Sequence, residues 1–209
     1  MMKTSKANVR TLTQLALLVA LELVLAYTPL GYLPIGPLSL SLLTIPVAIG
    51  AMVLGPLGGA VLGTVFGLTS FVNAMQGGSV MGTALFSASP ALTFVNCVVA
   101  RLLCGLFCAL FYGALKKAMP EKTKLCCTLG ALSAPVLNTV LFMGCLVLFF
   151  YRIDYVQQLA AGIGSTNPFT FVLLLVGLQG LIEAVVCCAV AAAVTVPLLA
   201  FLNKGKKAA

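Results

Sequence analysis

Three ionisable side chains lie inside strongly apolar segments of the sequence: Glu22, Arg101 and Glu183. An ionisable side chain near the middle of a bilayer costs about 2.5–3.5 kcal/mol on insertion scales, so each of them needs a partner or a function. The arginine guanidinium fits a carboxylate or a phosphate through two parallel hydrogen bonds. Two interpretations follow. Either Arg101 pairs with Glu22 or Glu183 to hold helices together, or it binds an anionic group of a ligand.

Two amides fall at the same predicted depth as Arg101. With a rise of about 1.5 Å per residue, Arg101 lies about 15 Å, Asn138 about 18 Å and Gln179 about 15 Å below the outer ends of three different predicted helices. Glu183 lies one turn below Gln179, about 21 Å down. We therefore predict a substrate site formed by four residues: Arg101, Asn138, Gln179 and Glu183. Asn96 is a fifth candidate, although a regular helix places it about 140° away from Arg101.

This chain contains few of the residue types that catalysis by side chains requires. It has no histidine and only four acidic residues, so hydrolases and metalloenzymes are disfavoured, and we expect no catalytic residues, metal or cofactor. The eight cysteines form no CxxC pair and are interpreted as small apolar packing residues. No GxxxxGK[ST] phosphate-binding loop is present, so active transport by this chain needs ion coupling or a separate ATPase.

The composition places the chain in a lipid bilayer. Hydrophobic residues make up 61% and charged residues 8%, with a mean hydropathy of +1.16, whereas soluble domains average about 45–50% apolar and about 25% charged residues. We predict an all-α membrane protein, a single integral membrane domain over residues 1–209 that forms a six-transmembrane-helix bundle. The predicted spans are 11–27, 39–54, 57–74, 91–115, 125–150 and 169–202. The second is the weakest, and a re-entrant or broken segment is the alternative there.

Basic residues orient these helices. The net charge is +8, and ten of the twelve Lys and Arg residues lie in three short patches at residues 3–10, 116–124 and 204–207. Because basic residues next to spans stay in the cytoplasm, an even number of spans between patches puts both termini on the cytoplasmic side. The charge therefore reflects orientation, and nucleic-acid binding is not expected. No cleaved signal peptide is predicted, since Glu22 interrupts the first apolar run.

Small residues recur at every fourth position along two predicted helices. Gly59, Gly63 and Gly67 follow this spacing in the third, and Ala16 and Ala20 in the first. Such ridges let helix backbones approach closely in lipid. We expect the glycines to pack within the bundle, whereas the alanine pair can face another subunit.

The predicted outer loops, 28–38, 75–90 and 151–168, are rich in Gly, Pro, Ser and Asn. They are expected either to close a site that opens outward or to serve as ordinary connections. The sequence leaves open which loop closes the site, and whether Tyr32, Asn73 or Arg152 reaches the ligand.

Seven short motifs run through nearly the whole chain. They are ALLVA at 16–20, IGPLSLSLLTIPVAIG at 35–50, LGPLGG at 54–59, GTVFG at 63–67, RLLCG at 101–105, NT at 138–139 and GLIE at 180–183. In order and spacing they resemble the substrate-binding S component of energy-coupling factor (ECF) transporters, a type of ABC importer. The pattern is most similar to the pantothenate-type branch, and an arginine at site depth suits a carboxylate.

The resemblance implies a subunit that binds a water-soluble vitamin or precursor from outside and releases it inside, in the plasma membrane of a prokaryote. It implies as partners a membrane scaffold subunit, docked on Ala16 and Ala20, and two cytoplasmic ATPases, so this chain is not itself an enzyme. Two other classes stay open. One is a standalone secondary transporter or channel with Glu22, Arg101 and Glu183 as a proton relay. The other is a structural membrane subunit without a ligand.

Overall fold

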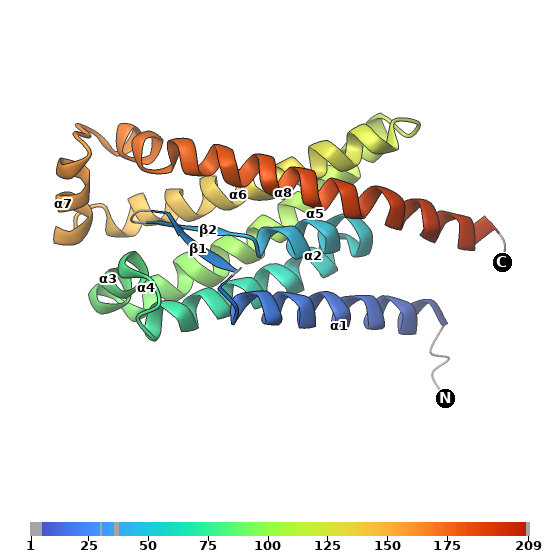
Figure 1. Ribbon diagram of the computed structural model, residues 1–209, viewed down its shortest axis with the longest axis horizontal. Coiled ribbons are helices and arrows are strands. Elements are labelled where there is room, and N and C mark those ends of the chain that lie inside the picture. The colour runs from blue at the N-terminus through green and yellow to red at the C-terminus, as the bar shows by residue number, and fades with distance from the viewer. Residues whose placement is uncertain (1–5, 30, 36–37, 208–209) are drawn as a thin grey trace.

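The computed structural model describes residues 6–29, 31–35 and 38–207, which are helical apart from one two-stranded hairpin (Figure 1). The helices are α1 (Lys6–Ala26), α2 (Thr44–Met75), α3 (Val80–Ala88), α4 (Pro90–Phe94), α5 (Ala100–Ala118), α6 (Thr123–Phe150), α7 (Asp154–Gly162) and α8 (Pro168–Lys207). A π-helical turn, η1 (Val95–Val99), joins α4 to α5, and the hairpin consists of β1 (Tyr32–Ile35) and β2 (Leu38–Ser41). The helical fold class is confirmed, and the hairpin is an addition that the sequence did not predict.

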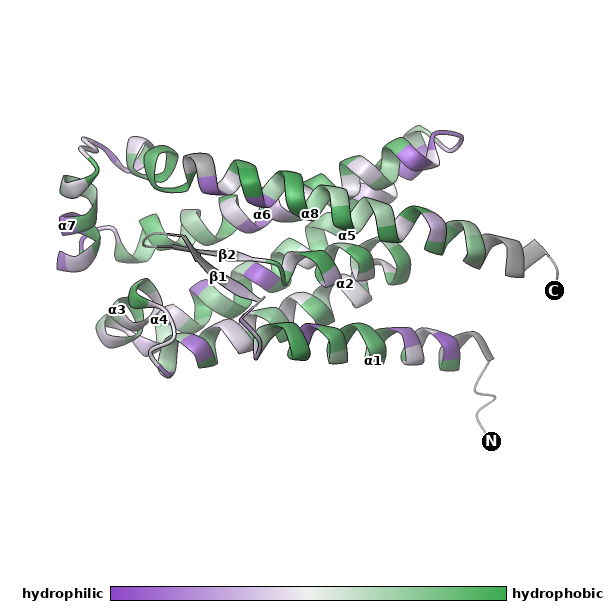
Figure 2. Cartoon of the chain, in the orientation of Figure 1, coloured by the Kyte–Doolittle hydropathy of each residue, from purple (hydrophilic) through white to green (hydrophobic). Residues whose placement is uncertain are grey.

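Five helical segments of the described chain are long and apolar enough to cross a membrane: Val9–Ala26, Thr44–Met75, Pro90–Ala118, Thr123–Phe150 and Gln179–Phe201. The long helices run along the long axis of the molecule, as Figure 1 shows. Apolar residues cover most of their middle stretches, and hydrophilic residues gather towards the two ends of the bundle (Figure 2). Helices of this kind satisfy their own backbone hydrogen bonds, which lipid requires. The chain is therefore a multi-pass membrane protein.

The predicted third span and most of the predicted second, from Thr44 onwards, fall within α2, which is broken at Gly55. Gly55 has φ 77° and ψ −162°, a conformation outside the helical region that is essentially restricted to glycine. The two halves fold back on each other, because a Cβ built on Gly58 would lie 3.2 Å from the Gly50 carbonyl oxygen. The half before the break, residues 44–54, is about 16 Å long, which is too short to cross a hydrocarbon core of about 30 Å.

The break at Gly55 thus falls between the predicted second and third spans, and the re-entrant alternative for the second span stays a prediction. The first residues of that span, 39–41, lie in β2, where alternating Leu and Ser follow the period of two that a strand requires. β1 and β2 pair antiparallel, with Tyr32 opposite Ser41 and Ile35 opposite Leu38. Five segments rather than six meet the length criterion for a span. The number of crossings and the cytoplasmic position of both termini stay predictions.

Short helices replace two of the three predicted outer loops. Ser79 and Ser89 cap α3 and α4 by accepting hydrogen bonds from backbone N–H groups of the first turns. α7 begins with Asp154, whose negative charge suits a helix N-terminus. An apolar cluster then joins α3, α6, α7 and α8 through Met81, Leu85, Phe150, Val156 and Phe171. We call this closed end of the bundle (α3, α4 and α7) the capped end.

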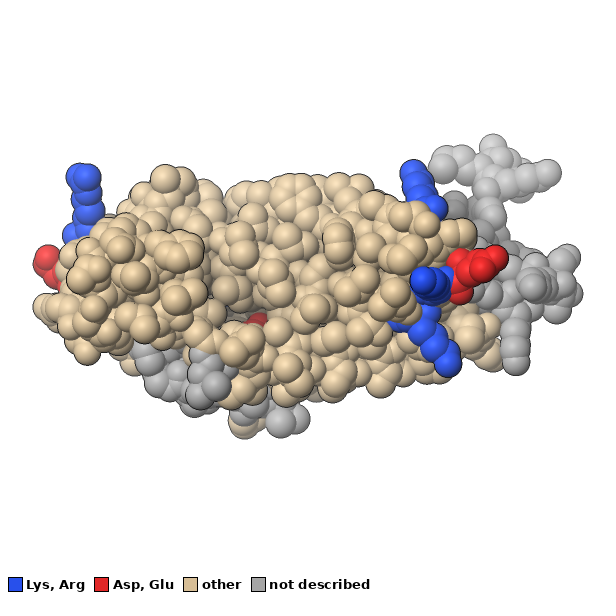
Figure 3. All heavy atoms as spheres, turned by 90° about the horizontal axis from the view of Figure 1, so that it is seen from above, with Lys and Arg blue, Asp and Glu red and all other residues tan. Residues whose placement is uncertain are grey.

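Exposed charges lie at the two ends of the molecule, as Figure 3 shows for one face. The turn between α5 and α6 carries Lys117, Glu121, Lys122 and Lys124, and the capped end carries Arg152 and Asp154. Between the ends, the charged residues of the described chain are Glu22, Arg101 and Glu183, and all three are buried. All three are thus shielded by the protein itself, whereas their predicted depths in the membrane stay predictions.

Candidate functional site

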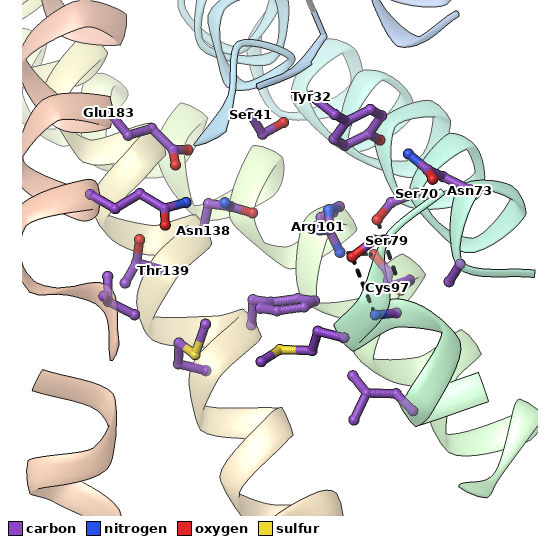
Figure 4. A pocket seen from close by; sticks show the side chains of 18 of the residues that line it. Tyr32, Ser41, Ser70, Asn73, Ser79, Cys97, Arg101, Asn138, Thr139 and Glu183 are labelled. Carbon is purple, nitrogen blue, oxygen red and sulfur yellow. Dashed lines mark hydrogen bonds between the residues drawn. The ribbon is translucent and has the colours of Figure 1, made fainter. Parts of the chain in front are cut away.

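A cavity of about 110 Å³ lies between the hairpin, α2, α3, the η1–α5 helix, α6 and α8 (Figure 4). Most of its polar side chains gather on one side in this view. Its apolar lining comes from Met81, Leu85, Cys97, Phe142, Met143 and Val176. The cavity therefore offers one surface for hydrogen bonds and another for an apolar part of a ligand.

Arg101 dominates the electrostatics of this cavity. It is the second residue of α5, directly after the π-helical turn, and only 7% of it is exposed. Its guanidinium lies over two aromatic rings, with Cζ 4.5 Å from the centroid of Phe66 and 4.7 Å from that of Phe142. Nη1 donates to the Cys97 carbonyl oxygen at 3.0 Å, and Nε has no partner. The two rings attract the cation but leave its hydrogen-bonding edge free.

Arg101 forms no ion pair with any residue that the structure describes. Glu22 of α1 is fully buried, both of its carboxylate oxygens lack a partner, and it does not line the cavity. Glu183 does line the cavity, and its Oε1 has no hydrogen-bond partner among the described residues. The interpretation of Arg101 as one half of a helix-joining ion pair is thus not supported. The alternative of a proton relay through Glu22, Arg101 and Glu183 is weakened as well, because Glu22 does not line the cavity that the other two share.

Four of the five predicted binding residues meet at this cavity: Arg101, Asn138, Gln179 and Glu183. Three of them come from different helices, α5, α6 and α8, as their predicted depths required. Several buried polar atoms in the lining have no hydrogen-bond partner, namely Ser41 Oγ, Arg101 Nε, Asn138 Oδ1 and Glu183 Oε1. Buried polar atoms are nearly always hydrogen-bonded in folded proteins. Their convergence on one cavity marks it as the candidate binding site.

Asn96, the fifth predicted residue, lies outside the lining of the cavity. It is fully buried in η1, and both its amide nitrogen and its amide oxygen lack a partner. Its neighbour Cys97 lines the cavity instead. The π-helical turn, which closes i→i+5 hydrogen bonds, changes the angular relation between residues before and after it. The exclusion of Asn96 from the lining nevertheless agrees with the separation of about 140° that a regular helix places between it and Arg101.

The sequence did not select six polar lining residues as candidates: Tyr32, Ser41, Ser70, Asn73, Ser79 and Thr139. Tyr32 and Asn73 had been left open, and the structure brings both to the cavity, whereas Arg152 is not in its lining. Ser70 and Asn73 are three residues apart near the end of α2, so they share one helical face. This spacing, together with Thr139 next to Asn138, was the available signal for these positions.

Tyr32 lies outside the membrane-spanning segments and is half-buried beside the cavity. Its hydroxyl is 3.4 Å from Thr69 Oγ1. Burial raises the pKa of Tyr32 above its ordinary value, while Arg101, Thr69 and Ser70 lower it in part. The phenol is therefore neutral at physiological pH, and it can both donate and accept a hydrogen bond.

Ala16 and Ala20 lie on an exposed face of α1. Most of this helix is unburied, since 6% of its apolar window lies inside the structure. Its outer face is thus available to lipid or to another subunit. The docking role of the two alanines stays a prediction.

The cysteines of the described chain are all free, and they pack among the helices. Cys104 donates to the Ala134 carbonyl oxygen at 3.3 Å and Cys108 to that of Gly130 at 3.5 Å, which ties α5 to α6. Among the residues that the structure describes, no group of three or more His, Cys, Asp or Glu side chains is placed to hold a metal ion.

Fold and cavity together define a class: a multi-pass helical membrane protein with a buried, partly polar binding site. The family of the ECF transporter substrate-specific component matches residues 10–195, and the chain belongs to this family. No curated protein matches the chain. Members of this family are transport subunits rather than enzymes, and they bind a small-molecule substrate and associate with an ECF module.

Proposed function

We propose that this chain captures a water-soluble vitamin or vitamin precursor that carries a carboxylate, with pantothenate as the first candidate. The single observation that carries this proposal is the guanidinium of Arg101, which is buried and lines the cavity, whose Nε has no partner, and which forms no ion pair with a carboxylate among the residues that the structure describes. A buried charge is strongly disfavoured unless it is paired. An anionic ligand group at the free edge of Arg101 supplies the missing partner.

The other unpartnered atoms indicate what else the ligand carries. Asn138 Oδ1 and Glu183 Oε1 lack a partner, and an amide oxygen or a carboxylate oxygen accepts hydrogen bonds. A ligand that fits this site therefore brings hydroxyl or amide donors in addition to its anionic group. A purely apolar acid leaves these acceptors buried and unsatisfied, which costs about 1–3 kcal/mol each.

The size of the cavity bears on how the ligand enters. Pockets for drug-sized molecules have volumes of about 300–1,000 Å³, and this cavity has about 110 Å³. A vitamin therefore requires the cavity to widen. The hairpin supplies Tyr32 and Ser41, and α3 supplies Met81 and Leu85. We infer that one of these two short elements moves when the ligand binds.

The transport cycle that we propose places this chain in the plasma membrane of a prokaryote. The ligand enters from outside at the capped end. The chain then docks on a membrane scaffold subunit through Ala16 and Ala20, and two ATPases on that module drive release inside. The support for this cycle is the family match together with the exposed face of α1.

The experiment is to extract bound small molecules from the purified full chain, identify them by mass spectrometry, and then titrate pantothenate by calorimetry. Arg101→Ala is expected to weaken pantothenate binding at least about 30-fold, because losing one partner of a buried charge pair costs about 2–5 kcal/mol. Arg152→Ala is the matched control, since Arg152 is exposed and not in the lining. Unchanged affinity in a folded Arg101→Ala protein contradicts the assignment of Arg101 to the ligand.

A further inference from the structure

One turn of α2, from Gly63 to Gly67, touches Arg101 and its surroundings in three separate ways. Gly63 meets the backbone, since a Cβ built there would lie 2.2 Å from the Arg101 carbonyl oxygen and 2.9 Å from its carbonyl carbon. Phe66 covers one face of the guanidinium at 4.5 Å. A Cβ on Gly67 would lie 2.7 Å from the carbonyl oxygen of Cys97. That oxygen accepts the hydrogen bond from Arg101 Nη1.

These contacts fix the position of Arg101 relative to α2. A Cβ atom essentially never lies within 3.0 Å of a heavy atom to which it is not bonded. A methyl group on Gly63 would begin 2.2 Å from the Arg101 carbonyl oxygen, so the distance between the two atoms would have to increase by about 0.8 Å. The neighbour is backbone, which cannot rotate aside as a flexible side chain does. In a close-packed interior such a separation displaces α5 or α2 as a unit.

Gly63, Phe66 and Gly67 do not line the cavity. An effect of these residues on a ligand is therefore indirect, through Arg101 and, for Gly67, also through Cys97, which lines the cavity. Phe142 of α6, the other ring close to the guanidinium, does line the cavity.

We propose that the turn from Gly63 to Gly67 is the positioning element of Arg101, and that it sets the preference of the cavity for an anionic over a neutral ligand. The second part rests on the proposed function, in which Arg101 meets the anionic group of the ligand. The first part concerns the geometry of this chain alone. The two parts are therefore tested by separate measurements.

The first measurement needs no ligand. The chain has three arginines, Arg10, Arg101 and Arg152, so ¹⁵N-arginine labelling of the full chain in lipid nanodiscs gives three Nε–H signals, which Arg101→Lys assigns. Two flanking rings displace the Arg101 signal upfield, and burial slows its exchange with water. In Gly63→Ala, the upfield shift of the Arg101 Nε–H signal is expected to be smaller, and this proton is expected to exchange with water faster.

The matched control is Gly113→Ala. Gly113 is also on α5, and an added Cβ there meets nothing within 4 Å, so the Arg101 signal is expected to stay unchanged. If Gly63→Ala does not fold, Phe66→Leu tests the same turn with no added bulk at the backbone contact. Because deleting the ring shifts the signal by itself, the readout for this variant is the exchange of the Arg101 Nε–H with water, which is expected to be faster. A wild-type Arg101 signal in a folded Gly63→Ala protein, or wild-type exchange in Phe66→Leu, overturns the positioning role.

The second measurement compares pantothenate with its neutral carboxamide in the same proteins. The wild type is expected to prefer the carboxylate, and Gly63→Ala to reduce that preference about tenfold, a typical consequence of misplacing a charged partner. If the wild type shows no preference, the proposed function fails, and the arginine signals alone decide the positioning role. If the wild type prefers the carboxylate and Gly63→Ala keeps the full preference, the selectivity inference fails while the proposed function stands.

Discussion

Arg101 is held by aromatic faces and one carbonyl oxygen, not by a carboxylate. The guanidinium lies over the rings of Phe66 and Phe142, and Nη1 donates to the carbonyl oxygen of Cys97. A carboxylate partner from the chain would occupy the same edge that a ligand needs. Aromatic rings attract the cation without using its N–H donors, so they stabilise the buried charge and leave its recognition edge free.

At the residue scale, Glu183→Gln tests whether the acceptor side of the cavity meets ligand donors. The substitution keeps the shape of the side chain and removes its charge, and hydrogen bonds to charged groups contribute about 1.5–3 kcal/mol. Pantothenate affinity measured by calorimetry is therefore expected to fall about tenfold or more. Glu121→Gln, at an exposed position in the α5–α6 turn, is the control. Equal affinity in both variants would show that Glu183 serves packing only.

Tyr32 gives a pH prediction. Because burial raises its pKa in the folded chain, the folded state holds the phenolic proton more tightly than the unfolded state. Its contribution to stability is therefore fully present below the ordinary tyrosine pKa of about 10 and is lost as the pH rises beyond it. Thermal unfolding followed between pH 8 and 11 should show a smaller alkaline loss of stability in Tyr32→Phe than in the wild type. Identical alkaline profiles would contradict the assigned environment of Tyr32.

At the scale of elements, the break in α2 positions the site. The half before Gly55 follows the hairpin, and the half after it carries Gly63, Phe66 and Gly67 against Arg101. Because of the reversal at Gly55, the hairpin and the later part of α2, with Ser70 and Asn73, both line the same cavity.

Gly55→Ala is expected to destabilise the chain by about 1–3 kcal/mol, because the backbone conformation of Gly55 is strained for any residue with a Cβ. Gly144→Ala on α6 is the matched control. An added Cβ at Gly144 meets nothing within 4 Å, and alanine favours a helix over glycine by about 1 kcal/mol. Thermal unfolding, followed by circular dichroism in detergent, should show a lower midpoint for Gly55→Ala but not for Gly144→Ala. Similar midpoints would indicate that the break relaxes without cost.

At the scale of the whole molecule, exposed charge is confined to the ends and α1 lies at the periphery with its outer face open (Figures 1 and 3). An outer helix with small residues on its free face is a suitable surface for close contact with another membrane helix. The binding cavity lies on the other side of α2 from this face, between α2, α5, α6 and α8. Docking and ligand binding are thus assigned to separate surfaces.

Ala16→Trp and Ala20→Trp are therefore expected to abolish co-purification with the ECF module while leaving pantothenate affinity within about twofold, since a bulky ring prevents close helix contact. Leu17→Trp, at another exposed position of α1, is the control that should keep the complex. Pull-down of the tagged chain with the scaffold subunit and ATPases measures the first quantity, and calorimetry the second. An intact complex in both alanine variants would refute this docking surface.

The sequence predicted the part of the site that lies inside apolar helices. Arg101, Asn138, Gln179 and Glu183 stand out there because a polar side chain in a bilayer is costly, and helical rise gives their depth. The hairpin and the short helices of the capped end were missed because their polar, Gly- and Pro-containing sequences also fit loops. The position of Asn96 outside the cavity agrees with its helical angle to Arg101, whereas the π-helical turn around it was not predicted from the sequence.

The ring of Phe142 lies 4.7 Å from the Arg101 guanidinium, in a chain that contains no tryptophan. Phe142→Trp would therefore place the only indole of the protein directly on the cation and at the wall of the cavity. Its fluorescence would be free of background from any other indole. When an anion binds the guanidinium, the electric field at the indole changes, and the wavelength of its emission maximum changes with it. The protein thus has a position at which occupancy can be read optically, in detergent, in nanodiscs or within the assembled transporter.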